Sequence, residues 1–207
     1  MGCYLGNIKT NNMKKLIYAI ALTGAAFAFQ ACNSGNKDAK ETADSMNKAK
    51  DTTSNMAATG GIAVDQKDAK FATTAAGGGM AEVALGKLAL EKSTNAQVKE
   101  FATMMVNDHG KANTELIGIA QAKNITLPDM VDEEHQKKLA DLEKKTGKDF
   151  DKAYVDAMVD GHKSTLKLMQ DEAKDGVDAE LKAFASKTAP VVQAHLDMIN
   201  KIHDSMK

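Results

Sequence analysis

The chain has 207 residues, of which 43% are hydrophobic, 27% are charged and 4% are aromatic, and its formal charge at pH 7 is −1. All 27 basic residues are lysine, so the chain has no guanidinium group to recognise phosphate or guanine in a bidentate manner. The low aromatic content and the absence of a basic excess also exclude a typical nucleic-acid-binding protein. Two cysteines also exclude a disulfide-stapled scaffold and a cysteine-rich zinc module.

Residues 1–31 have the pattern of a secretory signal peptide. A basic region at 13–15 is followed by an apolar stretch at 16–29, and Gln30-Ala31-Cys32 comes directly after it. Fourteen apolar residues fall short of the roughly 20 that a membrane-spanning helix needs. A cysteine in this place resembles the acylation site of bacterial lipoproteins, so we expect Cys32 to carry a lipid.

Acylation of Cys32 would attach the protein to a membrane and place it in the cell envelope, anchored at the outer membrane and facing the periplasm or the cell surface. An ordinary cleaved signal and an uncleaved apolar anchor are the alternatives. Residues 1–12 precede the basic region. They suggest a start codon assigned upstream of the true one, or residues added before the natural N-terminus.

Residues 32–63 are mostly small, polar and charged, and they contain no aromatic residue. Such a segment cannot bury enough apolar surface to offset the entropy of ordering it. We therefore expect a flexible linker between Cys32 and a folded domain at 64–207.

From residue 64 onward, apolar residues recur with the period of a helix, and no segment shows the period-two alternation of a strand. Asp65 and Asp178 are candidate N-caps, and Thr94 with Gln97 forms a candidate capping box. The pattern predicts four long helices and one short polar helix in the middle connection, at about 65–92, 95–123, 131–145, 149–174 and 179–205. The expected fold is all-α, a four-helix bundle with an extra short helix.

Each long helix carries one ionisable side chain within its apolar stripe, and these are Glu82, His109, His162 and His195. Inward Glu and His residues on facing helices are how several bundle proteins hold metal ions, and imidazole suits Zn, Cu, Fe and Ni. Valine stands three residues before each of the three histidines, where a carboxylate-bridged di-iron site requires Glu. The pattern therefore favours a mononuclear transition-metal site over a di-iron centre.

Three interpretations of these four residues stay open, the last of which is that the histidines are half-exposed and unrelated to one another. The first is a buried hydrogen-bond network in which neutral imidazoles bond to Glu82, Tyr154, Thr188 or backbone carbonyls. The second is a site for a single transition-metal ion, in which Met105 and Met158 would favour copper, although methionine in a stripe is usually core filling.

Further polar residues lie near the stripes. Asp108 and Asp160 flank them and would orient a metal ligand if they faced inward, but we expect solvated helix faces. His135 and His203 stand among polar residues and are expected at the surface.

The two halves of the domain share a pattern, since Phe101-x-x-x-Met105-Val106-x-x-His109 matches Tyr154-x-x-x-Met158-Val159-x-x-His162. Further positions belong to the same set: Phe150-Asp151-x-x-Tyr154, Glu82 before Gly86-Lys87-Leu88, and Pro190 before His195-Leu196. Over residues 64–205 this set resembles the ferritin-like family of bacterial envelope proteins labelled "predicted outer membrane protein". The resemblance implies a ferritin-like bundle and an envelope location, and it implies no reaction.

The functional expectation is an envelope lipoprotein whose bundle has a non-enzymatic binding or structural role. The alternative is a protein that binds Cu, Zn or Fe, or depends on one of them, through the Glu and His cluster. The domain contains no phosphate-binding glycine loop, no Gly-x-Ser-x-Gly motif and no cysteine nucleophile.

Overall fold

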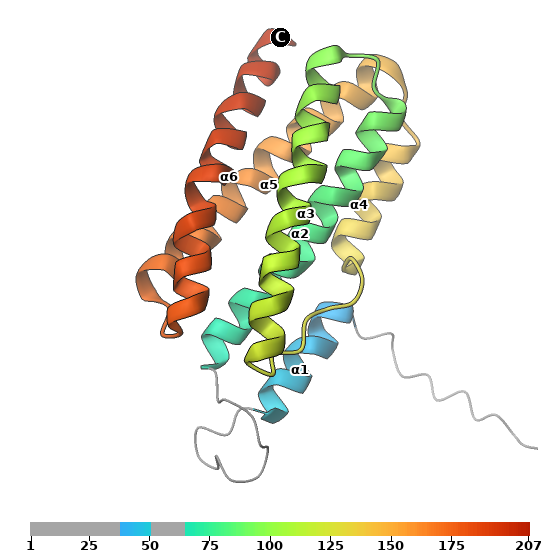
Figure 1. Ribbon diagram of the computed structural model, residues 1–207. Coiled ribbons are helices and arrows are strands. Elements are labelled where there is room, and N and C mark those ends of the chain that lie inside the picture. Colours follow the sequence, from blue (N-terminus) through green and yellow to red (C-terminus); the bar gives the residue numbers. More distant parts are fainter. Residues whose placement is uncertain (1–37, 51–64) are drawn as a thin grey trace, which may run out of the picture. The chain divides into compact units, whose positions relative to one another are not determined.

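The computed structural model describes residues 38–50 and 65–207, and all regular structure in these residues is helical (Figure 1). The helices are α1 (Ala39–Lys50), α2 (Gln66–Lys92), α3 (Ala96–Ala122), α4 (Glu133–Glu143), α5 (Gly147–Asp175) and α6 (Ala179–Ser205). The predicted signal region and Cys32 lie outside the described residues. No helix in the described part of the chain is long and apolar enough to cross a membrane.

The four long helices form two antiparallel hairpins, α2 with α3 and α5 with α6 (Figure 1). Helix α2 also packs on α5, and α3 packs on α6, which closes the bundle. The connection from α3 to α5 contains α4, which lies against α2 and α5 and leads the chain back along the bundle (Figure 1). The predicted all-α bundle with a short helix in its middle connection is confirmed, and the five predicted helices begin and end within two residues of the observed limits.

The helix starts follow local chemistry. Asp65 and Asp178 cap α2 and α6 as predicted, because each side chain accepts hydrogen bonds from backbone N–H groups of the first turn. The predicted capping box of Thr94 is wrong. Helix α3 begins one residue later, and the Asn95 side chain accepts the hydrogen bonds of the Gln97 and Val98 N–H groups.

The expectation of a flexible linker is wrong for residues 39–50, which form α1 and pack on α2. Asn47 is buried and bonds in both directions to Thr126, donating to its carbonyl at 2.8 Å and accepting from its N–H at 2.7 Å. Ala43 is also buried. These tertiary contacts supply the stabilisation that the composition of the segment does not indicate. The other residues of the predicted linker lie mostly outside the described ranges.

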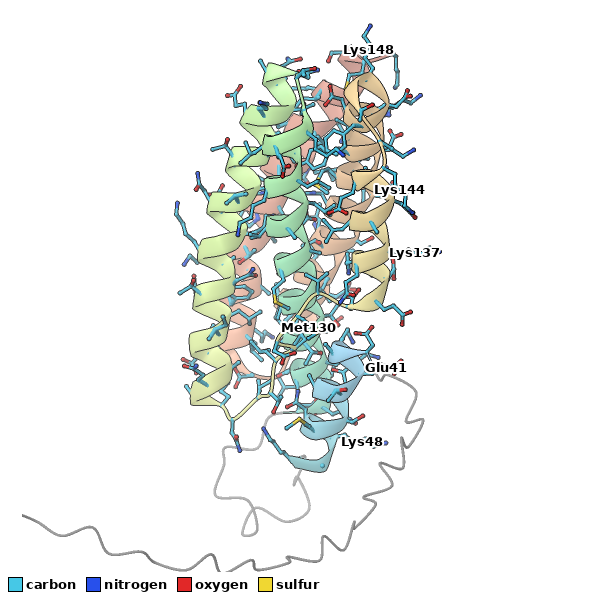
Figure 2. The ribbon with its side chains drawn as sticks, turned by 90° about the vertical axis from the view of Figure 1, so that its right-hand side faces the viewer. Glu41, Lys48, Met130, Lys137, Lys144 and Lys148 are labelled. Carbon is cyan, nitrogen blue, oxygen red and sulfur yellow. The ribbon has the colours of Figure 1, made fainter. Side chains whose placement is uncertain are left out.

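The core consists of two apolar clusters along the bundle. One contains most of the aromatic residues, among them Phe101, Phe150 and Tyr154, and the other is alanine-rich around Phe71 and Phe184. On α3, α5 and α6, one histidine stands between residues of the first cluster and residues of the second. Lys137 of α4 and Lys144, which follows the helix, point outward (Figure 2).

Candidate metal centre

Three imidazoles meet inside the bundle, one each from α3, α5 and α6. One ring nitrogen of each of His109, His162 and His195 lies within 4.8 Å of the other two. The ring centroids are 5.7, 5.5 and 5.6 Å apart, so the rings form a nearly equilateral triangle. All three side chains are buried. We call this group the histidine triad.

Each ring of the triad keeps one buried nitrogen without a hydrogen-bond partner among the described residues. These atoms are Nε2 of His109, Nε2 of His162 and Nδ1 of His195. Nearly all buried polar atoms in folded proteins have partners, so three such atoms at one place need an explanation.

The opposite nitrogens of two rings are held in place. His162 Nδ1 donates to the carbonyl of Met158 at 2.8 Å. His195 Nε2 lies 3.2 Å from Asp108 Oδ2, so it is the protonated nitrogen of a neutral ring beside this carboxylate. Metal-ligating histidines almost always use their second nitrogen in this way, which fixes the tautomer and aims the free nitrogen at the ion.

The triad is held in the neutral form that binds metals. Burial, together with repulsion by His162 and His195, lowers the pKa of His109 to about 3. The pKa of His162 falls to about 4, again mainly through burial. Burial also lowers the pKa of His195, although Asp108 opposes this shift. At neutral pH none of the three rings needs to lose a proton before it binds a cation.

One side of the triad is closed by the aromatic-rich cluster. The Phe101 ring lies edge-on to His162 and His195, with centroid distances of 5.7 and 6.4 Å. Met105 and Met158, one turn before His109 and His162, are fully buried members of the same cluster. Both methionines therefore fill the core beside the triad.

Glu82 lies beside the triad. Its Oε1 is 3.7 Å from Nδ1 of His162, the nitrogen that bonds to the Met158 carbonyl. Its Oε2 is buried and has no partner in the described part of the chain. Burial raises the pKa of Glu82 to about 8, so the side chain is mainly a neutral acid at pH 7. Gly161 makes room for it, because a Cβ there would lie 3.1 Å from Oε1.

The first interpretation expected hydrogen bonds between the triad and Tyr154 or Thr188, and the structure does not show them. Tyr154 is fully buried, its hydroxyl has no partner among the described side chains and backbone groups, and burial raises its pKa. Thr188 is half-buried in α6 and borders a cavity. Within residues 38–50 and 65–207, the ring nitrogens of the triad form hydrogen bonds only to Met158 and Asp108.

A cavity of about 440 Å³ reaches the triad at His109 and is also bordered by Glu82. It extends to Glu134 and Asp160, which are exposed, so it connects the site with the surface. Gly78 borders it as well. The neighbouring Gly79 allows a close approach of α2 to α3, since a Cβ there would overlap the side chain of Asn113.

The other polar residues divide between the site and the surface. The expectation that Asp108 is simply solvated is wrong, because this half-exposed carboxylate bonds to His195. Asp160 is exposed, as expected. His135 and His203 are half-buried and pair with Asp132 and Asp156 at 2.7 and 3.3 Å. Sequence reasoning did not find Phe101 or Gly161 as parts of the site, because neither carries a polar group.

A family model described as a domain of unknown function (DUF4142) matches residues 51–202, and the chain therefore belongs to this family. The matched region includes the whole triad, Asp108 and Glu82. The chain matches no curated protein and no solved structure.

Proposed function

We propose that this member of the DUF4142 family binds a single transition-metal ion through His109, His162 and His195, as the non-enzymatic binding role of an envelope protein. The observation that carries the proposal is the set of three neutral, buried imidazoles, each with one ring nitrogen lacking a partner within the described residues. A purely structural network would satisfy these nitrogens, whereas a metal ion satisfies all three at once.

The spacing suits an ion after small ring movements. Zinc binds imidazole nitrogen at about 2.0–2.1 Å, which places the nitrogens around a tetrahedral ion about 3.4 Å apart. The separations of up to 4.8 Å in the triad require each ring to turn slightly inward. Glu82 is not a fourth ligand in this arrangement, because its Oε1 lies 3.7 Å from the outer nitrogen of His162, which bonds to the Met158 carbonyl.

The donor set favours borderline metals. Three imidazoles without a thiolate suit Zn, Cu, Fe and Ni, and a given nitrogen site binds divalent copper more tightly than the other first-row ions. We expect Cu(II) to bind most tightly and Zn(II) to bind measurably.

The same proposal places the protein in the cell envelope, attached by acylated Cys32 to the outer membrane. The basic, apolar and small-residue pattern before Cys32 supports it. Two hairpins joined by one long crossover also support a ferritin-like assignment for the bundle. Labelling with radioactive palmitate tests the anchor, and Cys32→Ala is expected to abolish the label. Label that survives this substitution would contradict acylation at Cys32.

The metal proposal is tested by elemental analysis and calorimetric titration of the full chain, purified without an affinity tag. We expect one equivalent of Cu(II) or Zn(II), and loss of binding in His162→Phe. His203→Phe is the matched control, because His203 is a half-buried histidine of α6 that pairs with Asp156 away from the triad. Circular dichroism checks that both variants stay helical. Equal metal binding in the two variants, or none in the wild type, would overturn the proposal.

A further inference from the structure

The histidine triad is accessible from one direction. His162 and His195 are 0% and 2% exposed, and Phe101 covers them from the aromatic-rich cluster. His109 is 7% exposed and is the member of the triad that borders the cavity of about 440 Å³. If the triad binds an ion, as proposed above, any further ligand reaches that ion through this cavity.

An ion held by the triad would have the cavity beside it, because His109 borders the cavity. Three imidazoles occupy three positions, and metal sites with three protein ligands typically keep a further position for water or another molecule. Oε1 of Glu82 faces the outer nitrogen of His162, and Oε2 is buried without a partner in the described part of the chain. Glu82 also borders the cavity, so it can form a hydrogen bond with a molecule bound there.

The cavity has the size and lining of a small-molecule site. Ligand pockets usually enclose about 300–1,000 Å³, mostly between apolar walls with a few polar groups. Here Leu116, Leu168, Phe184 and Val192 supply apolar walls. The polar lining includes Asn113, Thr165, Thr188, His135 and Lys138.

The charge at the inner end favours an anionic donor. The three imidazole ligands are neutral and do not compensate the double charge of a divalent ion. An anionic oxygen is therefore preferred as a further ligand. Lys138 in the lining lies 3.8 Å from Glu134, with which it forms an ion pair, and Asp160 lies at the exposed end. The acidic groups therefore lie at the surface end of the cavity, and the apolar walls suit the body of an organic molecule.

We infer that the cavity binds a small organic anion, a carboxylate or phenolate with an apolar body, whose oxygen completes the coordination of the ion held by the histidine triad. Glu82 contacts the bound anion, and the walls from α3, α5 and α6 hold its apolar part. This inference rests on the proposed metal site and assigns it a ligand class.

Benzoate, acetate and azide are suitable probes for the full chain loaded with Cu(II). Electron paramagnetic resonance and the visible absorption of copper report a ligand that enters the coordination sphere. We expect saturable binding of benzoate with one equivalent at saturation, and about tenfold or more tighter than acetate, because the apolar walls contact only the larger anion. Azide, which needs only the open position, is expected to bind as well.

A cavity-filling variant separates the cavity from the ion. A Cβ at Gly78 would meet no atom within 4 Å, so Gly78→Leu extends into the cavity without a backbone clash and is expected to weaken benzoate binding about tenfold or more. Gly118→Leu is the matched control, since Gly118 is an exposed helical glycine with equally open surroundings outside the cavity, and it should bind benzoate like the wild type. Thr165→Leu fills the cavity from α5 and serves as the second variant if Gly78→Leu does not fold.

The outcomes distinguish the two proposals. Absence of copper binding in the wild type overturns the metal site, and this inference with it. Copper binding without any spectral response to azide or benzoate leaves the metal site standing and overturns the open position. A response to azide with benzoate no tighter than acetate, or benzoate binding that neither cavity-filling variant weakens, overturns the organic anion as the ligand class.

Discussion

Two groups of buried polar side chains in this bundle differ in whether their polar atoms have hydrogen-bond partners. At the turn between α5 and α6, the fully buried carboxylate of Asp68 accepts hydrogen bonds from the N–H groups of Val177 and Asp178. Nearby, Lys123 lies 2.7 Å from carboxylate oxygens of both Asp178 and Glu180. In the histidine triad, by contrast, each ring keeps a nitrogen without a partner among the described residues.

The difference separates a structural role from a functional one. Paired groups at the turn fix the approach of α2 to the second hairpin, and their burial is offset by the bonds they make. An unsatisfied buried donor or acceptor costs about 1–3 kcal/mol, so the triad in its metal-free form lowers the stability of the fold. One buried atom near the turn also lacks a hydrogen-bond partner in the described part of the chain, and this is Oε1 of Glu172.

The largest effect is expected at the turn. Asp68→Ala removes the buried carboxylate that accepts the hydrogen bonds of the Val177 and Asp178 N–H groups, and it should lower the free energy of unfolding by about 3 kcal/mol. Urea denaturation of the metal-free chain measures this loss. Asp65→Ala, which removes an exposed N-cap of the same helix, should cost only about 1 kcal/mol and serves as the control. Equal losses in the two variants would contradict a special role for Asp68.

Replacement of a triad member should have the opposite effect on the metal-free protein. His109→Leu removes a buried nitrogen without a described partner and should leave the free energy of unfolding unchanged or raise it by about 1 kcal/mol. In the wild type, Cu(II) at a hundredfold excess over Kd should add about 2.7 kcal/mol, and His109→Leu should lose this gain. Thermal unfolding with and without copper measures both. A metal-free variant destabilised as strongly as Asp68→Ala would indicate that the triad is structural.

Asp108 should affect metal affinity with little effect on the fold. Its carboxylate is half-exposed and orients His195, and loss of such an outer-shell partner typically weakens metal binding about 10- to 100-fold. Competition titration of Asp108→Asn against a chelator of known affinity measures the change. Asp160→Asn, at an exposed position on α5, should bind metal like the wild type. Identical affinities in all three proteins would show that Asp108 does not orient the site.

The pH dependence of stability separates Glu82 from the histidines. The pKa of Glu82 is about 8 in the folded state against an ordinary value of 4.5, so the unfolded chain releases this proton first and stability falls as pH rises from 4.5 to 8. His109 and His162, with pKa values of about 3 and 4 against 6.5, act in the opposite direction and cost stability as pH falls below 6.5. Between pH 6.5 and 8 the Glu82 effect is therefore not opposed by the histidines.

In that window Glu82→Gln should reduce the decline in the free energy of unfolding by about 1–2 kcal/mol, measured by urea denaturation of the metal-free chain. The control is Glu91→Gln, at an exposed position of the same helix, which should keep the wild-type slope. A wild-type slope in Glu82→Gln would show that this carboxyl group ionises at its ordinary pH.

The sequence alone determined the helices, their limits and the placing of one ionisable residue in each apolar stripe, because these follow from a period of 3.6 residues and from local capping. Composition failed for α1, whose stability comes from Asn47 and Thr126, residues far apart in the chain. Acylation of Cys32 stays a prediction.

Only the tertiary structure decided which stripe residues meet and which of their atoms stay without partners. A rotation of 100° per residue means that small changes in helix register move a side chain to another neighbour, and packing across the whole bundle sets that register. For this reason three histidines converge, Glu82 lies beside the outer nitrogen of His162, and Asp108 bonds to a ring on another helix. Tyr154 and Thr188 form no hydrogen bond with the triad.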